Sequence, residues 1–209
     1  MTKTILQIAV PMFVFMSAAT AQQAERRELQ LRASSFVFAR YASGSASVLY
    51  AGRGLGPIGG FVGMVQNPKT QYRELIVGSY TQLNWSRQSV LVGVGYADAS
   101  DSQYLQTYIT PSFASGRLSL STTLEWYEPL GRAGVRQLDM NPVSLAVRMS
   151  DQLWAGAAYT LALGDHATAR HRMGPVLEWA TRHDKLRVEV LHRTVGETVE
   201  VRAVIVAAF

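Results

Sequence analysis

A histidine and a threonine near the end of the chain have a spacing that could support hydrolysis. His192 and Thr194 are two residues apart, so on a β-strand both side chains would point to the same side. Such a pair could act as general base and nucleophile, with a third residue orienting the imidazole. Threonine is a poor substitute for serine, and the sequence supplies no acidic or amide partner. We therefore interpret His192 as an interfacial histidine and predict that the protein is not an enzyme.

Three candidate metal ligands lie close together, at Asp165, His166 and His171. Imidazole and carboxylate groups of this kind can hold a transition metal. No second group of ligands accompanies them in the sequence, so nothing would complete the coordination shell. We interpret them as solvated loop residues and predict neither a metal nor a cofactor.

The segment from Gly54 to Gly59 matches a dinucleotide-binding fingerprint in its glycine spacing. That fingerprint works only between a strand and a helix, because the helix N-terminus holds the pyrophosphate. The sequence around it indicates strands and no helix. We therefore predict a glycine-rich turn between two strands.

Charged side chains alternate with apolar ones near the C-terminus. Arg187 and Glu189 share one face of a segment, and Glu200 and Arg202 share one face of the next. If these segments pair as antiparallel strands, ion pairs are expected across them, for example between Arg187 and the last strand. The inward charges predicted from this pattern along the chain include Arg148, Arg187, Arg202, Glu125, Glu178, Glu189 and Glu200. They either lock the interior in a network of ion pairs or line a path for anions.

The last thirteen residues indicate which element carries these charges. Every second position back from Phe209 is apolar and includes Ile205 and Val201, whereas Glu200 and Arg202 occupy the opposite face. A strand with one apolar face, one charged face and a terminal aromatic residue is what a transmembrane β-barrel requires.

The same period of two recurs along the chain. Short polar breaks alternate with longer ones, as expected for short periplasmic turns and longer outer loops. The first two strands are the least regular, so a ten-stranded barrel with 22–57 as an N-terminal tail or plug is the alternative. The favoured fold is all-β, a single antiparallel transmembrane barrel of about 12 strands. These lie at 34–43, 46–53, 58–66, 71–85, 87–97, 103–114, 117–127, 139–150, 152–163, 171–182, 184–193 and 197–209.

Aromatic and small residues add two expectations to this barrel. Interfacial girdles are expected at both rims, because Trp and Tyr combine an apolar body with a polar tip. They would comprise Trp85, Phe113, Trp179 and Phe209 on the periplasmic side and Tyr96, Tyr104, Trp126 and Tyr127 on the outer side. Small inward residues would leave one side of the lumen open; these are Gly93, Gly95, Ser119, Ser121, Gly156 and Ala158.

The first residues predict export from the cytoplasm. An apolar run within 1–21 is followed by small residues at Ala19 and Ala21, which suits cleavage by signal peptidase before Gln22. The run is too short for a comfortable transmembrane helix. No apolar stretch of about eighteen residues follows it, although 48% of the chain is hydrophobic. A barrel would spread these apolar residues over a lipid-facing belt.

The formal net charge of +5 comes almost wholly from arginine, with seventeen Arg against three Lys. The arginines are spread along the alternating strands instead of forming one cluster, which disfavours a nucleic-acid partner. Planar, permanently charged guanidinium groups suit a polar lumen, an anionic lipopolysaccharide surface or an acidic solute.

The signal, the alternating strands, the aromatic rims and the terminal Phe209 together resemble a bacterial outer-membrane β-barrel protein. The resemblance implies a signal peptide at 1–21, a periplasmic segment at 22–33 and a transmembrane β-barrel at 34–209. It also implies an outer-membrane location, contacts with its lipids and lipopolysaccharide, and insertion by barrel-assembly machinery. That machinery would read Phe209, Ile205 and Val201 as the insertion signal.

For function, the sequence favours a narrow passive pore for small solutes, with anions as the expected class. The first alternative is a closed structural barrel that contacts surface partners, motivated by the mixed signs of the interior charges. The second is an outer-leaflet lipid-modifying enzyme, motivated by His192 and Thr194.

Overall fold

The computed structural model describes residues 30–100, 102–132, 134–165, 169–181, 183–193 and 199–209. The predicted signal peptide at 1–21 lies outside these residues, as does most of the predicted periplasmic segment. Within the described ranges, no helix has the length and apolar character needed to cross a membrane. The strands are β1 (Gln30–Leu31), β2 (Phe36–Ala42), β3 (Ser47–Leu55), β4 (Ile58–Asn67), β5 (Tyr72–Trp85), β6 (Gln88–Ala99), β7 (Gln103–Ser115), β8 (Leu118–Ser121), β9 (Leu124–Pro129), β10 (Gln137–Arg148), β11 (Leu153–Gly164), β12 (Arg170–Ala180), β13 (Asp184–Arg193) and β14 (Val199–Ala208).

These strands close into one antiparallel barrel. Consecutive strands pair around the wall, and β14 returns to pair with β2 from Arg202 opposite Ala42 to Ala208 opposite Phe36. β1 is a short addition at the edge of β5, and β8 with β9 occupies one position, so fourteen strands make a twelve-stranded wall. The predicted all-β barrel of about twelve strands is confirmed. The ten-stranded alternative is wrong, because β2 and β3 are full members of the wall.

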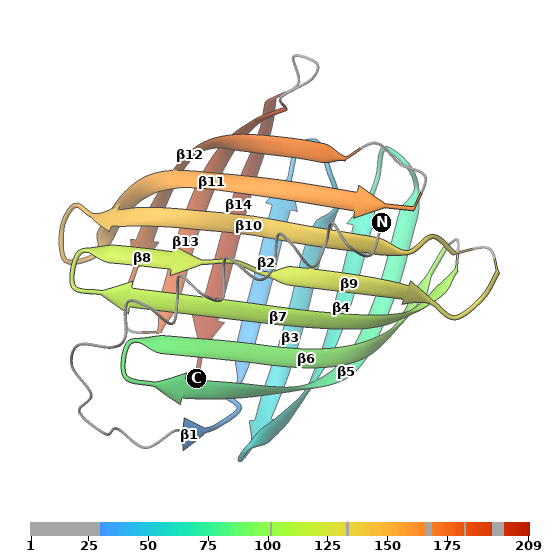
Figure 1. Cartoon of the computed structure of the whole chain (residues 1–209), viewed down its shortest axis with the longest axis horizontal. Coiled ribbons are helices and arrows are strands. Elements are labelled where there is room, and N and C mark those ends of the chain that lie inside the picture. Colours follow the sequence, from blue (N-terminus) through green and yellow to red (C-terminus); the bar gives the residue numbers. More distant parts are fainter. Residues whose placement is uncertain (1–29, 101, 133, 166–168, 182, 194–198) are drawn as a thin grey trace.

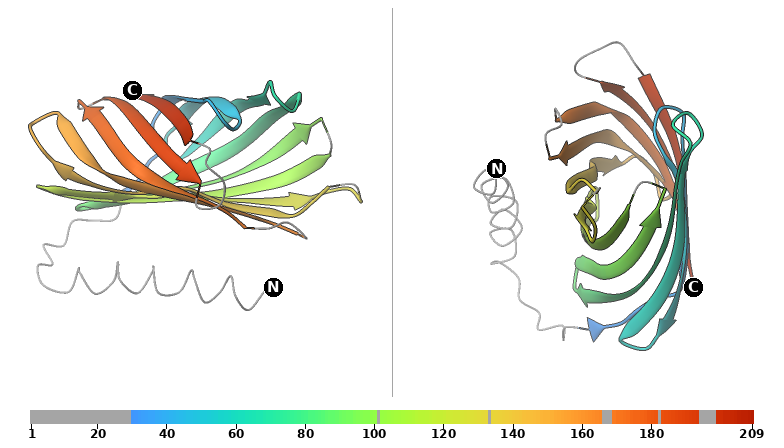
Figure 2. Two further views of the ribbon diagram at one scale, coloured as in Figure 1. Left: turned by 90° about the horizontal axis from the view of Figure 1, so that it is seen from above. Right: turned by 90° about the vertical axis from the view of Figure 1, so that its right-hand side faces the viewer.

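The two walls of the barrel cross at an angle. In Figure 1, β6 to β11 form the nearer wall, and β2 to β4, β13 and β14 run behind them. The two turned views show the same sheet curving round an enclosed interior (Figure 2). Strands in a closed barrel tilt against the barrel axis, which is why front and back strands cross.

Side chains alternate between an apolar outer surface and a buried interior. On β14 the outward Val201 and Ile205 are 43% and 54% exposed, whereas the inward Arg202 and Val204 are buried. The same alternation along β4 and β5 leaves Val62, Leu75 and similar large apolar groups on the outside. An outer face of this kind suits hydrocarbon and would be unfavourable in water.

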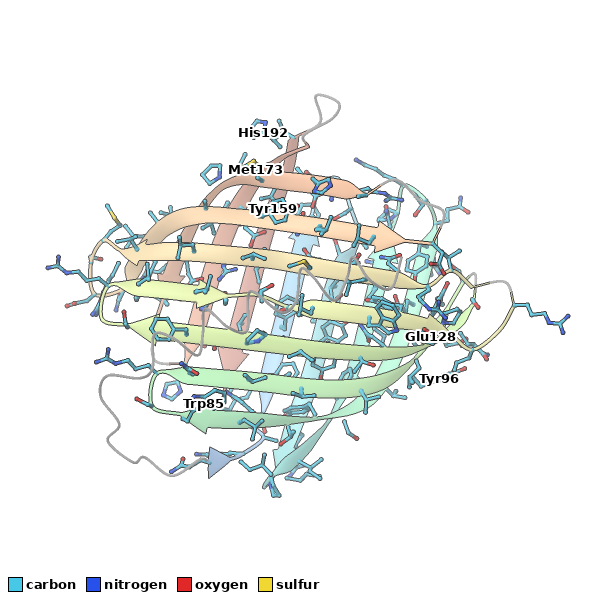
Figure 3. The ribbon with its side chains drawn as sticks, viewed as in Figure 1. Trp85, Tyr96, Glu128, Tyr159, Met173 and His192 are labelled. Atoms are coloured by element: carbon cyan, nitrogen blue, oxygen red, sulfur yellow. The ribbon has the colours of Figure 1, made fainter. Side chains whose placement is uncertain are left out.

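The two ends of the barrel differ in the length of their connections. At one end, called here the turn end, the strands are joined tightly, as at Gly56–Pro57 and Ser86–Arg87, and Phe209 lies there. The other end, called here the loop end, carries longer connections such as 130–136 and 165–169. Trp85 lies near the turn end, and Tyr96 and Glu128 lie near the loop end (Figure 3). The predicted alternation of short and long connections holds for most of the wall, but the connection 149–152 at the turn end is as long as 68–71 at the loop end.

The glycine-rich segment forms the tight turn predicted for it. Leu55 and Ile58 are the last paired residues of β3 and β4, so the turn contains only Gly56 and Pro57. Gly56 has φ +88°, a conformation that glycine adopts without a Cβ clash. The segment therefore has a structural role in the hairpin and no helix to hold a phosphate.

One predicted strand, at 117–127, is divided into β8 and β9 at Thr122 and Thr123. The carbonyl of Pro111 on β7 accepts the Thr122 N–H at 3.1 Å, but proline has no N–H to return a bond. On the other side β10 has a bulge, where Asn141 and Pro142 together oppose the single residue Thr160. The regular ladder is thus lost on both sides of Thr122–Thr123, because neither neighbour presents a full set of donors in register.

A short N-terminal segment extends the wall at the turn end. β5 continues past the beginning of β4, and β1 pairs with this uncovered edge, with Leu31 opposite Leu83. The Ala33 N–H donates to the carbonyl of Gly56, and the Tyr80 hydroxyl donates to the carbonyl of Ser34 at 2.6 Å. Residues 30–35 therefore cover a sheet edge that would otherwise be open.

Candidate functional site

The barrel encloses a cavity of about 710 Å³. All twelve positions of the wall contribute lining residues, from Phe36 and Ala208 near the turn end to Asn67 and Val135 near the loop end. Ligand sites are usually concave and of comparable size. The interior is therefore the candidate functional site.

A chain of alternating acidic and basic groups runs along one side of this interior, on β12, β13 and β14. Arg172 Nη1 lies 3.2 Å from Glu200 Oε2, and Glu200 also binds Arg202. Arg202 Nη1 lies 4.0 Å from Glu189 Oε2, whose other oxygen lies 3.5 Å from Arg187. Each acid thus lies between two basic residues.

The chain ends at Glu178 near the turn end. Arg187 donates to Glu178 Oε2 through Nε at 2.9 Å and through Nη2 at 2.7 Å, and Lys185 Nζ lies 3.1 Å from Glu178 Oε1. Glu178 and Arg187 face each other on β12 and β13, so the bond follows directly from strand register. Planar bidentate contacts of this kind hold both groups in fixed positions.

The acids of this ion-pair chain are buried, and the basic groups at its two ends reach the cavity. The side chains of Glu178, Glu189 and Glu200 are 5% exposed or less, whereas Arg172 is 21% and Lys185 37% exposed. Both basic residues line the cavity. A solute in the lumen would therefore meet Arg172 and Lys185, whereas Glu178 and Glu200 lie beneath them; Glu189 borders the cavity but is almost fully buried.

Tyrosines and acids occupy the interior face of the opposite strands. The Tyr127 hydroxyl donates to Glu125 at 3.2 Å and accepts from the Gln106 amide at 3.0 Å. The Tyr72 hydroxyl donates to Glu74 at 2.9 Å. Buried carboxylates are stabilised by such hydrogen bonds because the interior supplies little water.

Aromatic rings fill the part of the interior that β2 to β7 enclose. Phe61 packs edge to face with Tyr50, Tyr80 and Tyr108, at centroid distances of 6.0, 6.5 and 5.5 Å. Phe36 meets Tyr80 at 5.2 Å. Phe61 and Tyr108 come from β4 and β7, so their contact bridges strands that are not neighbours. Such edge-to-face pairs are favourable beyond the area they bury.

Glycines make room for these rings, which corrects the prediction of an open side. A Cβ atom at Gly93 would lie 2.0 Å from the Tyr108 ring, and one at Gly95 would lie 3.1 Å from Phe61. Ala158 is buried in a packed cluster with Val176 and Leu191. Ser121 lines the cavity as expected. The sequence pattern identified small inward residues correctly but could not show that neighbouring side chains cover them.

The structure places most predicted interior charges inside the barrel. Glu125, Arg187, Glu189 and Arg202 line the cavity, and Glu178 and Glu200 are buried beside it. Arg148 is placed differently: it is exposed at the β10–β11 turn, where it bonds to Ser150 and Asp151 and lies over the Trp154 ring. Its parity is inward, but β10 ends there, so the side chain leaves the lumen.

Two further sequence expectations change in detail. The predicted pairing between the last two strands exists as Glu189–Arg202, whereas Arg187 pairs with Glu178 on the preceding strand. Tyr104 is buried among the interior aromatics and Tyr127 lines the cavity, so neither belongs to the outer girdle. Both tyrosines lie near the loop end as predicted, but their positions in the strand alternation direct their side chains inward, away from the lipid.

The residues predicted for insertion lie on the outside of the barrel, and so does His192. Phe209, Ile205 and Val201 are all exposed, and their role as an insertion signal stays a prediction. His192 is exposed on β13, and Thr194 lies outside the described residues. Of the three predicted loop residues, His166 also lies outside them, and His171 bonds to the Tyr159 hydroxyl at 2.6 Å. No cluster of three metal-ligating side chains occurs in the described ranges.

The strand pattern of the sequence did not identify several residues that line the lumen. Arg172 and Lys185 share the parity of Glu178 and Arg187, so the alternation could have identified them. Arg40 and Asn141 could not be found in this way, because β2 is irregular in pattern and a bulge changes the parity of β10 at Asn141. Whether the acids lie beneath the cations depends on how β12, β13 and β14 are aligned with one another, and the residue pattern of a single strand does not show that alignment.

Comparison with known proteins identifies the fold. No protein-family model matches the sequence, and no curated protein matches it. A structure of KdgM porin in complex with disordered oligogalacturonate is similar, with a TM-score of 0.55 and 14% identity, over 85% of this chain and 99% of that one. A second KdgM porin structure gives 0.53 and 13%, over 85% and 99%. A NanC porin structure gives 0.51 and 14%, over 84% and 98%. The chain thus has the fold of a bacterial outer-membrane β-barrel, as its sequence indicated.

Proposed function

We propose that this protein is a narrow outer-membrane pore that passes small solutes passively and prefers anions. The observation that carries the proposal is the arrangement of the ion-pair chain, in which Arg172 and Lys185 face the cavity and their acidic partners are buried. Charges that line a water-filled path determine which ions enter it. The turn end would face the periplasm and the loop end the exterior.

The cavity favours a pore over the closed structural barrel. Its lining extends from residues near one end of the barrel to residues near the other, which a path for solutes requires. The ion-pair chain itself fits either function, because buried acids and arginines also stiffen a wall. The likeness to porins supports the same choice at the level of the fold.

Ion selectivity of the refolded barrel in a planar lipid bilayer tests the proposal. We expect discrete conductance steps and a reversal potential in a KCl gradient that indicates preference for chloride. The double variant Arg172→Gln, Lys185→Gln should reduce this preference, because it removes two cations from the lumen surface. Both acids keep another partner, since Glu200 retains Arg202 and Glu178 retains Arg187.

The matched control is Arg148→Gln, which removes a cation at the exposed turn outside the cavity. It should leave the reversal potential unchanged. A folded barrel that shows no conductance would overturn the proposal of a pore. A conducting barrel that prefers potassium would overturn the proposed anion preference. So would a double variant with the same reversal potential as the wild type.

A further inference from the structure

We infer that Asn141 and Arg202 form the constriction of the lumen and that Asn141 sets its selectivity by holding the Arg202 guanidinium across the interior. This inference rests on the proposed pore. Arg202 Nη1 donates to Asn141 Oδ1 at 2.5 Å. The two residues belong to β14 and β10, which three wall positions separate, so the bond spans the interior instead of joining neighbouring strands.

The wall itself brings Asn141 to this position. The bulge at Asn141–Pro142 inserts one extra residue into β10 opposite Thr160. The Asn141 N–H donates to the carbonyl of Thr123 at 2.7 Å, at the interruption between β8 and β9. Bulges re-aim side chains and often occur next to functional sites. Here the interruption between β8 and β9 and the bulge in β10 break the regular alternation of side chains, and the Asn141 amide points at Arg202.

The sector behind this bond is occupied by the ion-pair chain and by a small apolar cluster. β11, β12 and β13 contribute Ala158, Val176 and Leu191, all buried and in contact as one cluster. On the other side, Phe61 and Tyr108 meet across the part of the lumen between β4 and β7. The Asn141–Arg202 bond and the aromatic rings therefore narrow the interior from two sides, while Arg172 still reaches the cavity.

The chemistry of the pair suits an anion filter. Arg202 is fixed by Glu200 through Nε and by Asn141 through Nη1, so its cation has a defined place. An amide accepts the hydrogen bond without adding a negative charge, whereas a carboxylate at position 141 would add a further acid to a guanidinium that Glu200 already pairs with. Asn141 is in this view a positioning residue, and an uncharged acceptor is essential to its role.

Two variants at one position test the inference. Asn141→Asp keeps the size and the acceptor but adds a charge, so the reversal potential should move toward cation preference while the barrel stays folded. Asn141→Cys places one thiol in a chain that has no natural cysteine. Its reaction with the anionic reagent sulfonatoethyl methanethiosulfonate should reduce single-channel current by about half or more, because the adduct would occupy the narrowest section.

The control is Arg148→Cys, where complete modification, verified by mass, should leave the current unchanged. If Asn141→Cys does not fold, Thr123→Cys is the substitute. Thr123 lines the cavity next to β9, and its carbonyl accepts the Asn141 N–H, so the thiol would lie at the same height in the barrel. Absence of conductance in the folded wild-type barrel would defeat the proposed pore, and the constriction with it. Normal conductance that neither Asn141→Asp nor thiol modification alters would defeat the constriction alone.

Discussion

Phe61 on β4 and Gly78 on β5 are directly paired residues, and the phenyl ring lies over the glycine. A Cβ atom at Gly78 would lie 2.4 Å from the Phe61 ring and 2.3 Å from the carbonyl oxygen of Val94. Two separate contacts thus require the absence of a side chain at this position. The aromatic cluster of the interior depends on glycines in the wall as much as on its own rings.

We expect Gly78→Ala to lower the free energy of unfolding by about 1–3 kcal/mol, because the added methyl group must displace both contacts. Chemical denaturation in detergent measures the change. Gly60→Ala is the control, since Gly60 is on the outer face of β4 and a Cβ there would have one contact, at 3.8 Å. Both substitutions restrict the unfolded chain equally. Equal stability of the two variants would show that no ring lies over Gly78.

A second prediction concerns the buried end of the ion-pair chain. Glu178→Gln removes the carboxylate that pairs with Lys185 and leaves Arg187 with only its longer contact to Glu189, so we expect a loss of about 3–5 kcal/mol in unfolding free energy, as for other broken buried pairs. Glu128→Gln is the comparison, because its bidentate bond to Arg136 is in solvent at the loop end. Exposed pairs contribute little. Similar losses in the two variants would contradict the burial of the chain.

The hydrogen bond from Tyr80 to Ser34 should control access to the N-terminal segment. Tyr80→Phe removes a donor worth about 1 kcal/mol, which corresponds to about a fivefold increase in local opening of 30–35. Trypsin cleavage after Arg32, followed by mass spectrometry, measures this opening. Tyr108→Phe keeps the same aromatic cluster without affecting Ser34 and should cleave at the wild-type rate. Unchanged cleavage in Tyr80→Phe would show that other contacts hold the segment.

The exposed C-terminal residue allows assembly to be separated from stability. If Phe209 is read during insertion, Phe209→Ala should reduce the fraction of barrel that reaches the membrane in cells. The side chain is 75% exposed, so unfolding of the purified, refolded variant should differ little from that of the wild type. Tyr41→Ala, another exposed aromatic, is the control for insertion. Normal assembly of the Phe209 variant would remove the residue from the insertion signal.

The strand pattern was recognisable because each strand separates a lipid-facing side from an enclosed one. β14 illustrates this, since Val201 and Ile205 point outward and Arg202 inward without interruption. Even the weak first strands follow the expectation, because β2 has to pair with β14 to close the wall. Periodicity is a property of each strand separately, so one sequence is sufficient to reveal it.

The interior was less predictable because it depends on which strands are neighbours. Gly93 on β6, taken alone, suggests free space in the lumen. In the structure the Tyr108 ring of the neighbouring strand β7 covers it. The interruption at Thr122 has its cause in Pro111 and in the β10 bulge, both outside the strand that it divides. Arg148 shows a third limit, since correct parity does not place a side chain in the lumen at the very end of a strand.

The meeting of the first and last strands has a consequence for biosynthesis. β2 pairs with β14, and the N–H of Phe209 donates to the carbonyl of Ser35 at 2.9 Å. The ring cannot be completed until β14 has been synthesised, and an unfinished sheet would present two bare edges prone to aggregation. A cell that makes this protein must keep its unfolded chain apart from others until β2 and β14 have met.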